Sequence, residues 1–569
     1  MQIANVTNQD SNSLEWQTIN WRAANDAVNN LRRRIYRAST QSNYKIVRNL
    51  QRLLLKSTAN KLLSIRRVTQ QNHGRYTPGV DKVIIDTDKG RENLYRQLTK
   101  STTYNPHPVK RVYIPKKNGK NRPLGLPSII DRCWQAIVKS ALEPYWEAKF
   151  EATSYGFRPG RSAHDAIQKI FCIARAGKSR QWVLDADIKS AYDCINHSFL
   201  MKLIKGFPGR SMIYKWLKAG VMENNCYSPT EVGTPQGGII SPLLANIAFH
   251  GMENALGIEY WKDNVLKLKC PYMLVRYADD FVVFAKSQVS CLEAKEKLQH
   301  FLAERGLQLS EEKTHVRHLT EGFDFLGFNI KHYATRGKKR GYVLLCKPSK
   351  MSVRSYKQQM KQVWKSVIGI PTESAIKLLN SKIIGWCNYF RIGSSKRTFS
   401  VIDNWMFWRQ IRFLARRHPN KQWWWWKKHY FGMVKGRQDR WVFKDTISGN
   451  TLWKHAWTKI KRHTLVKGKF SPDDPTLQKY WRARQANKSV FLYGIKPILA
   501  RKQKGICLVC RQPLDNGELL HVHHIIAKAL GGNDKVSNLC LLHKACHRQI
   551  HSKFGHKVEV SKLLEPYAG

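Results

Sequence analysis

The chain has 569 residues, with 98 Lys and Arg against 40 Asp and Glu, so its formal net charge is +58. This excess of like charge opposes compaction and indicates a polyanionic partner, for which nucleic acid is the leading candidate. No apolar run approaches the length of a membrane span and no secretory signal is present at the N-terminus, so we expect no membrane partner and a cytoplasmic location.

The cysteines are distributed unevenly. Twelve are too few for a disulfide scaffold in a chain of this length. Four of them lie beyond residue 500, together with seven of the 20 histidines. That clustering of sulfur and imidazole predicts a separate metal-binding module, whereas the other eight cysteines are interpreted as reduced core residues.

The N-terminal part is basic and helical in pattern. Residues 1–75 place apolar and basic side chains at helical spacing, which predicts helices with a face toward RNA or a template strand; a solvated helix face is the alternative. Residues 111–127 read as strand, turn and strand. Lys116, Lys120 and Arg122 on this hairpin are candidates for binding a triphosphate or a phosphate backbone.

Two acidic elements follow. Asp185 and Asp187 alternate on a predicted strand, so they share one face. Asp279 and Asp280 occupy the turn of a predicted β-hairpin over residues 271–285, where like charges are costly unless a hard cation such as Mg²⁺ neutralises them. The strand-end carboxylate and the acidic turn together have the composition of a two-metal site, in which the cations activate an attacking oxygen and stabilise a leaving one. An exposed acidic turn is the alternative.

A glycine-containing segment, TPQGG at 234–238, lies between the acidic elements. Glycine permits a close backbone approach, so a flat ligand could lie against this segment before the apolar helix predicted over 240–249. A plain loop before a buried helix is the alternative.

The C-terminal tail contains two short-range pairs of metal-binding side chains. Cys507-x2-Cys510 and His543-x2-Cys546 supply four ligands of the types and spacing that zinc prefers. We therefore predict a zinc site, with Cys540 as the alternative to His543.

The motifs follow one another in the order found in reverse transcriptases: Asp187-Ile-Lys-Ser-Ala-Tyr192-Asp193, Pro235-Gln236-Gly237, Tyr277-Ala-Asp-Asp280, Lys313 and Phe325-Leu326-Gly327. Over nearly its whole length the chain resembles the reverse transcriptase/maturase encoded within group II introns. The resemblance implies a multidomain α+β fold, with a right-hand polymerase whose fingers and palm contain an antiparallel sheet, a helical thumb/maturase domain and a small zinc-containing ββα HNH domain. The expected divisions are an N-terminal extension and fingers at 1–125, palm at 126–340, thumb/maturase at 341–440, a DNA-binding segment at 441–500 and an HNH endonuclease with its zinc site at 501–569.

The resemblance also implies roles for single residues of the polymerase. Asp187, Asp279 and Asp280 would hold two Mg²⁺ ions for attack of a primer 3′-hydroxyl on a dNTP. Lys313 could protonate the departing pyrophosphate. Tyr192 would stack beneath the incoming sugar, Gln236 would line the nucleotide pocket, and the triphosphate would be clamped by Lys116 and Arg122. Asp185 and Asp193 are interpreted as structural.

The second half of the tail resembles an HNH endonuclease. His524 would deprotonate the attacking water and Asn538 would orient the hairpin, while His523, His547 and His551 would bind a divalent cation. His547 and His551 are four residues apart and so face the same side of a helix. A purely structural zinc knuckle is the alternative, but it gives no reason for this set of histidines.

Four consecutive tryptophans, 423–426, lie in the expected thumb/maturase domain. Helical geometry spreads four consecutive side chains around the axis, so they cannot all enter one core. We expect some of them to face another domain or RNA, with packing between domains as the alternative. Residues 441–500 are rich in Trp, Lys and Arg and are interpreted as a DNA-contacting segment and linker.

The function implied by the resemblance has three parts: an RNA-directed DNA polymerase, a maturase that assists intron splicing, and an HNH endonuclease that nicks target DNA to prime reverse transcription. The partners would be group II intron RNA in a ribonucleoprotein, double-stranded target DNA and dNTPs. When bound to target DNA, the protein would be associated with the nucleoid. One alternative is an RNA-binding splicing chaperone without polymerase activity, against which the intact polymerase motifs argue. The other is a reverse transcriptase without a splicing function.

Overall fold

The acidic elements lie on one antiparallel sheet of the computed structural model, with strand order β6-β7-β3-β8. Its strands are β6 Met273–Tyr277, β7 Asp280–Ala285, β3 Trp182–Asp187 and β8 His315–His318. The structure describes residues 14–100, 104–115, 119, 121–260, 267, 270–337, 340–434, 436–486 and 494–554.

This sheet of β6, β7, β3 and β8, called the palm sheet below, separates two hydrophobic cores. Leu184 and its cross-strand partner Val283 belong to the core shared with the N-terminal helices. Val183 and its partner Phe284 belong to the core shared with the helices that follow residue 349. The alternation follows from the two-residue period of a strand. Further helices complete the fingers and palm: α5 Ile129–Glu147, α6 Ala163–Ala174, α7 His197–Leu203, α8 Arg210–Leu217, α9 Ser241–Ala248, α10 Met252–Ala255 and α11 Gln288–Ala303.

The N-terminal part is helical, as the sequence pattern predicts for its described residues. Helices α1 Trp21–Thr40, α2 Tyr44–Lys56 and α3 Thr58–Arg66 begin at Asn20, Asn43 and Ser57, whose side chains accept hydrogen bonds from backbone N–H groups of the first turn. Such caps satisfy donors that have no partner within the helix. Helix α4 Asp88–Lys100 and the short helices η1 Trp16–Thr18, η2 Arg67–Gln71 and η3 His73–Tyr76 complete this part.

The predicted basic hairpin is present as β1 Val109–Pro115 and β2 Asn121–Leu126, paired antiparallel. Strand β1 also pairs in parallel with β4 Val221–Glu223, which pairs with β5 Cys226–Ser228, so a second sheet has the order β2-β1-β4-β5. Lys116 and Lys120 of the turn lie outside the described residues.

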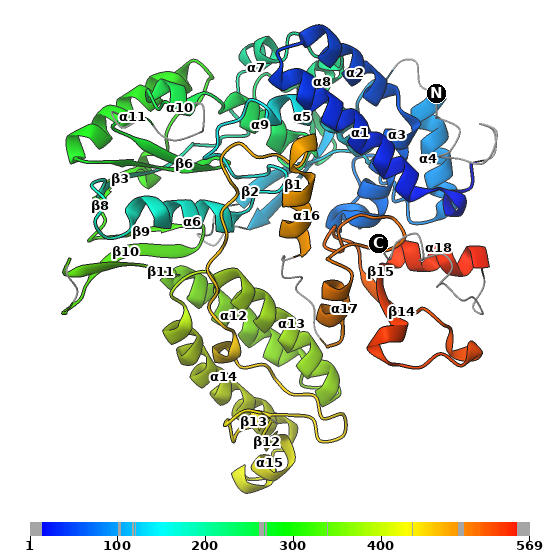
Figure 1. Cartoon of the computed structure of the whole chain (residues 1–569), viewed down its shortest axis with the longest axis vertical. Helices are drawn as coiled ribbons and strands as arrows, with labels where there is room; N and C mark the ends of the chain where they lie inside the picture. The colour runs from blue at the N-terminus through cyan, green and yellow to red at the C-terminus, as the bar shows by residue number, and fades with distance from the viewer. Residues whose placement is uncertain are drawn as a thin grey trace.

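A third sheet and a group of helices, together called the thumb below, come next in the chain, and the helices form the lower part of Figure 1. The sheet has the order β11-β10-β9, and β12 pairs with β13 further along the chain. The strands are β9 Phe323–Phe325, β10 Phe328–Ala334, β11 Tyr342–Pro348, β12 Phe431–Gly432 and β13 Val442–Phe443. The helices are α12 Lys350–Ser366, α13 Thr372–Phe390, α14 Lys396–Arg417 and α15 Trp423–Tyr430.

The described chain after residue 441 first packs against α12 and α14 and then reaches the N-terminal helices. His455 is fully buried, with its imidazole bonded to the Asp403 carboxylate at 2.7 Å and the Tyr356 hydroxyl at 2.8 Å. Further on, the Asp473 carboxylate pairs with the Arg32 guanidinium of α1 at 2.7 Å. Short helices η5 His455–Trp457 and η6 Pro475–Leu477 lie on this path, followed by α16 Gln478–Ala486 and α17 Lys496–Lys502.

The C-terminal part is a two-stranded hairpin followed by a helix: β14 Leu520–His524, β15 Leu539–His543 and α18 Lys544–Phe554. It lies beside the N-terminal helices (Figure 1), and its buried apolar side chains belong to the same core as those of α1 and α3. Among the described residues, no helix combines the length and the apolar character needed to cross a bilayer.

Hydrogen bonds from buried polar groups fix the backbone of the turn between β6 and β7. Arg276 is fully buried, and its guanidinium donates to the Asn246 side-chain oxygen at 3.0 Å and to the Ala278 carbonyl at 3.3 Å. Asn246 donates to the Gly156 carbonyl at 2.8 Å. Gly156 lies so close that a Cβ atom there would be 2.3 Å from the Ala278 nitrogen. The backbone of the acidic turn is therefore fixed by its contacts with this part of the palm.

We predict that Gly156→Ala lowers the thermal midpoint of unfolding (Tm) by several degrees, because the added methyl group must displace the turn and overpacking costs about 1–3 kcal/mol. Differential scanning calorimetry of the full chain measures this. Gly206→Ala is the matched control, since a Cβ at Gly206 meets nothing within 4 Å. The same Tm for both variants would contradict the predicted clash.

Candidate active sites

The acidic turn places three carboxylates at one end of the palm sheet. Ala278, with φ +57°, and Asp279 form the turn between Tyr277 and Asp280, which pair across the hairpin. Asp280 also pairs with Asp187 across β7 and β3. Directly opposed residues of an antiparallel pair have Cβ atoms about 4.5–5.5 Å apart, so these two carboxylates can share a ligand. The structure thus brings together the three aspartates that the sequence predicts.

The electrostatics of this cluster favour a bound cation. Desolvation by the surrounding protein, with the charges of Asp279 and Asp187, raises the pKa of Asp280 to about 7, although its side chain reaches the surface. Burial, with the charge of Asp187, also raises the pKa of Asp279. Divalent cations would relieve both effects, and oxygen ligands suit Mg²⁺.

Lys313 lies beside the cluster, on the short helix η4 Glu311–Lys313. Its ammonium group pairs with the Asp187 carboxylate, while two thirds of its side chain remains exposed. The hydrogen bond to Asp187 raises the pKa of Lys313. The lysine is therefore protonated near neutral pH, and its proton is available to a ligand at the carboxylates.

Gln236 forms hydrogen bonds both with the hairpin β1–β2, called the fingers hairpin below, and with Asp193. Its side-chain oxygen accepts from Arg122 Nε at 2.8 Å and its amide nitrogen donates to the Asp193 carboxylate at 3.1 Å. Its backbone carbonyl accepts from the Gly125 N–H at 2.7 Å. Tyr192 is buried nearby, and burial, together with the charge of Asp279, raises the pKa of its hydroxyl. Lys116, the other predicted triphosphate contact, lies outside the described residues.

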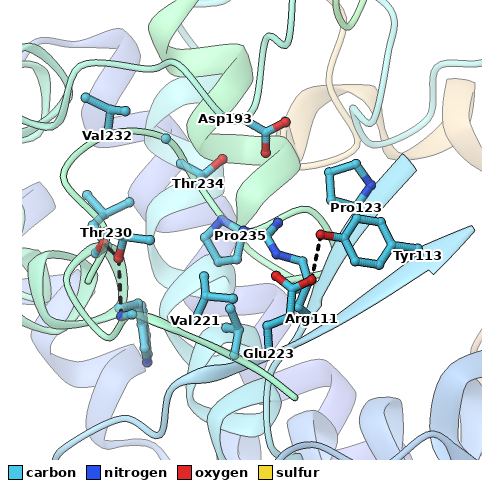
Figure 2. A pocket seen from close by; sticks show the side chains of 16 residues that line it. Arg111, Tyr113, Pro123, Asp193, Val221, Glu223, Thr230, Val232, Thr234 and Pro235 are labelled. Carbon is cyan, nitrogen blue, oxygen red and sulfur yellow. Dashed lines mark hydrogen bonds between the residues drawn. The ribbon is translucent and has the colours of Figure 1, made fainter. Parts of the chain in front are cut away.

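A cavity of about 360 Å³ opens between the fingers hairpin and the segment that precedes Gln236. Figure 2 shows the Tyr113 hydroxyl directed at the Glu223 carboxylate, a hydrogen bond of 2.8 Å, with Asp193 on the opposite side of the cavity. The carboxylate that binds the Gln236 amide is therefore also part of the cavity wall.

A second cluster lies in the C-terminal part. The potential ligand atoms of Cys507, Cys510, His543 and Cys546 are all within 4.8 Å of one another, and all four residues are buried. His543 Nε2 is 3.1 Å from the Pro513 carbonyl, which leaves Nδ1 facing Cys510 Sγ at 3.3 Å. This donor set suits a tetrahedral zinc ion, and the carbonyl contact fixes the tautomer that binds it. Cys540 is buried elsewhere, so the cluster contains His543 and not Cys540.

Three histidines, one from strand β14 and two from helix α18, form another cluster. The ligand atoms of His523 from β14 and of His547 and His551 from α18 lie within 4.8 Å of one another. His523 Nε2 is buried and has no hydrogen-bond partner in the described part of the chain. Burial and the charges of the other two rings lower the pKa of His523 to about 4, so it is neutral and able to bind a cation. Helix α18 therefore contributes ligands to both clusters.

His524 and Asn538 lie beside the histidine cluster. His524 Nε2 is 2.8 Å from the Asp534 carboxylate, which leaves Nδ1 as the basic nitrogen. Asn538 accepts from the Ile526 N–H at 2.8 Å and donates to the Ile526 carbonyl at 3.0 Å, so it fixes the loop that follows β14. The roles predicted for both residues in DNA cleavage stay predictions.

Sequence reasoning missed two supporting residues. Arg276, within an otherwise apolar strand, could have been found, because a charge in a buried strand must have a partner. Asp534 lies in a polar loop, where the sequence Asn-Asp-Lys gives no sign of a contact with His524.

The chain matches four known families in sequence order. Residues 16–98 match the N-terminal domain of reverse transcriptase, and residues 114–330 match reverse transcriptase (RNA-dependent DNA polymerase). Residues 353–431 match the group II intron maturase-specific domain, and residues 507–553 match HNH endonuclease.

Curated relatives agree with these matches. The protein YkfC of Escherichia coli is 34% identical over 316 residues, which cover 49% of this chain and 83% of YkfC. The group II intron-encoded protein LtrA of Lactococcus lactis is 31% identical over 432 residues, 61% of this chain and 71% of LtrA. The putative COX1/OXI3 intron 2 protein of Saccharomyces cerevisiae is 24% identical over 588 residues, 88% of this chain and 66% of that protein. The chain belongs to the group II intron-encoded reverse transcriptase/maturase family, with reverse transcriptase, maturase and HNH endonuclease domains.

Proposed function

We propose that the protein drives the movement of a group II intron into DNA. It would stabilise the folded intron RNA for splicing, nick a DNA target with its HNH domain, and copy the RNA from the 3′-hydroxyl that the nick creates. The observation that carries this proposal is the presence of two potential cation sites on one chain, the opposed Asp187 and Asp280 carboxylates and the histidine cluster of His523. The first reaction makes the primer for the second.

In the polymerase site, Asp187, Asp279 and Asp280 would hold two Mg²⁺ ions. When bound, these ions supply Lewis acidity at the attacking and leaving oxygens. The chain itself orients the reactants: the fixed backbone of the turn sets the position of the carboxylates, and Arg122 and Gln236, bonded to each other, present the donors of the nucleotide pocket. Buried Tyr192 would form the surface beneath the sugar.

Proton transfer would use Lys313. Its ammonium group pairs with Asp187, one of the carboxylates that would hold the cations. A proton moving from Nζ to the departing pyrophosphate oxygen would neutralise charge that develops in the transition state.

In the nuclease site, His523, His547 and His551 would bind a divalent cation that polarises the scissile phosphate. His524 would remove a proton from the attacking water through Nδ1, with Asp534 holding Nε2 and stabilising the imidazolium. Asn538 would keep the loop beside the base in place. Zinc at the cluster of Cys507 would be structural, because four protein ligands leave no open position.

A hollow of about 870 Å³ on the thumb supports contact with single-stranded nucleic acid. It combines exposed aromatic rings with four basic side chains, and none of the described residues that line it is acidic: Trp424, Lys427, Lys428, Phe431, Gly432, Met433, Arg440, Trp441 and Lys454. Trp424 is 71% exposed, and Lys427 Nζ lies 5.1 Å from its ring centre. Stacking rings beside phosphate-binding cations are the usual means of holding unpaired nucleotides.

The expected domain divisions remain part of this proposal. We assign 441–500 as the DNA-binding segment on its content of Trp, Lys and Arg, together with its place between the thumb and the nuclease. Intron RNA in a ribonucleoprotein, double-stranded target DNA and dNTPs would be the partners.

For the polymerase site, we predict that Asp279→Ala abolishes Mg²⁺-dependent dNTP incorporation, because a carboxylate that holds the cations is removed. Primer extension on an RNA template measures this. The variant should still nick duplex target DNA at the wild-type rate. Equal, negligible incorporation by variant and wild type would instead favour the splicing chaperone without polymerase activity.

For the nuclease site, we predict the reciprocal result. His524→Ala should stop strand cleavage of duplex target DNA, since the general base is lost, yet extend a primer from DNA that already contains the nick. Cleavage is followed by denaturing electrophoresis of end-labelled DNA, and RNA binding by filter retention should be unchanged. Cleavage at the wild-type rate would refute the assignment of His524.

For the thumb hollow, we predict that Trp424→Ala weakens binding of single-stranded RNA about tenfold, since stacking contributes about 1–3 kcal/mol per base. Fluorescence anisotropy at fixed salt measures the Kd. Ile447→Ala, which removes another exposed apolar side chain outside the hollow, is the control and should bind as wild type does. The same Kd for both variants would exclude stacking on Trp424.

A further inference from the structure

The cluster of Cys507 is in contact with a residue from the other end of the chain. Arg66, at the end of α3, is fully buried, and its Nη2 lies 3.2 Å from Cys546 Sγ and 3.0 Å from the Glu518 carboxylate. The guanidinium carbon is 4.7 Å from the centre of the Trp21 ring. A guanidinium of the polymerase's N-terminal helices therefore donates directly to a sulfur atom of the nuclease.

This contact has a physical consequence that depends on the metal. A zinc-bound sulfur is a thiolate, and three thiolates with one neutral imidazole leave the zinc cluster with one negative charge in a buried place. Buried charge is costly unless a charged hydrogen-bond partner compensates it. Within the described residues, Arg66 Nε and Nη1 have no hydrogen-bond partner, so Glu518 and Cys546 are the acceptors that compensate the buried guanidinium.

Further contacts continue this interface on both sides of Arg66. Asn25 of α1 donates to the backbone carbonyl of Cys510 at 3.2 Å and accepts from Gln512 at 2.7 Å. Gln71 donates to both Gln512 and Glu518, at 2.9 and 3.1 Å.

Helix α18 makes its own contacts with the N-terminal segment. The Gln549 amide donates to the Gln17 and Ile19 carbonyls at 2.7 and 2.8 Å. Gln549 is three residues after Cys546 on the same helix, but its amide donates to the N-terminal segment and not to a residue of the cluster. Apolar side chains of the two parts also share one core.

We propose that the nuclease is a docked part of the polymerase, and that Arg66 is a positioning residue for the zinc cluster, so that zinc binding and docking stabilise each other. The proposal rests on the zinc assignment made above. A thiolate accepts the Arg66 hydrogen bond far better than an uncoordinated thiol does. By linkage, any free energy that docking adds to zinc binding is returned by zinc to docking.

The test uses the full-length protein and compares Arg66→Met and Arg66→Lys with Arg67→Met, which removes the same charge from the exposed neighbouring residue. The rate of zinc transfer to a chromogenic chelator is measured. We expect Arg66→Met to accelerate the transfer about tenfold or more, the range seen when partners of metal ligands are removed. Arg66→Lys should restore part of the effect, and Arg67→Met should behave as wild type does.

A second measurement does not depend on a core substitution. Hydrogen exchange of the wild type, with and without chelation, should show that zinc removal increases exchange in α1 and α3 as well as in α18. Gln549→Ala, which removes the hydrogen bonds of α18 with Gln17 and Ile19 but no cluster residue, should also accelerate zinc transfer. These two results decide the matter even if Arg66→Met fails to fold.

Two outcomes would distinguish a failure of the zinc assignment from a failure of the proposed coupling between zinc binding and docking. Wild-type protein without zinc by elemental mass spectrometry would overturn the zinc assignment and this proposal with it. Zinc at one equivalent, with equal transfer rates in all variants and unchanged exchange in α1 and α3 after chelation, would overturn the coupling alone.

Discussion

The pairing of β3 with β7 is the constraint on which the rest of the polymerase depends. Its register sets Leu184 opposite Val283 for one core and Val183 opposite Phe284 for the other, so a shift by one residue would turn both apolar sets to the wrong side. The same register sets Asp187 opposite Asp280. Hydrophobic burial on two faces thus fixes the position of two carboxylates that repel each other.

The cost of that repulsion is met by groups around the turn. Arg276 holds the backbone of the turn from below, and its own charge needs a buried partner, Glu151, whose carboxylate lies 3.6 Å away. Although burial opposes it, the neighbouring His250, whose Nδ1 lies 3.4 Å from the carboxylate, and the charge of Arg276 lower the pKa of Glu151 to about 2, so this carboxylate stays ionised. Lys313 pairs with Asp187 from the solvent side. The charges around the acidic turn therefore alternate in sign from the core to the surface.

Sequence patterns predicted the local elements and the ligand types well, because strand alternation, turn chemistry and ligand spacing are local properties. The basic hairpin, the acidic turn and the four-residue zinc set follow from such patterns, and the structure groups His543 with the cysteines where Cys540 was the alternative. Contacts between distant segments could not be predicted in this way. Nothing near Arg66 or Asn25 indicates a partner more than 450 residues away, because such pairing depends on how whole domains pack.

Packing between those domains also limits how the two active sites can cooperate. The apolar side chains around Cys507 and Leu541 belong to the same core as Ala24 and Ile65, so the nuclease cannot move away from the polymerase without exposing apolar surface, at about 25 cal/mol for each Å². The buried pair of Arg66 and Glu518 would lose its compensation in the same movement. In the proposed function, a nicked strand would therefore reach the acidic turn chiefly by movement of the DNA, and the net positive charge of the chain would help to retain that DNA.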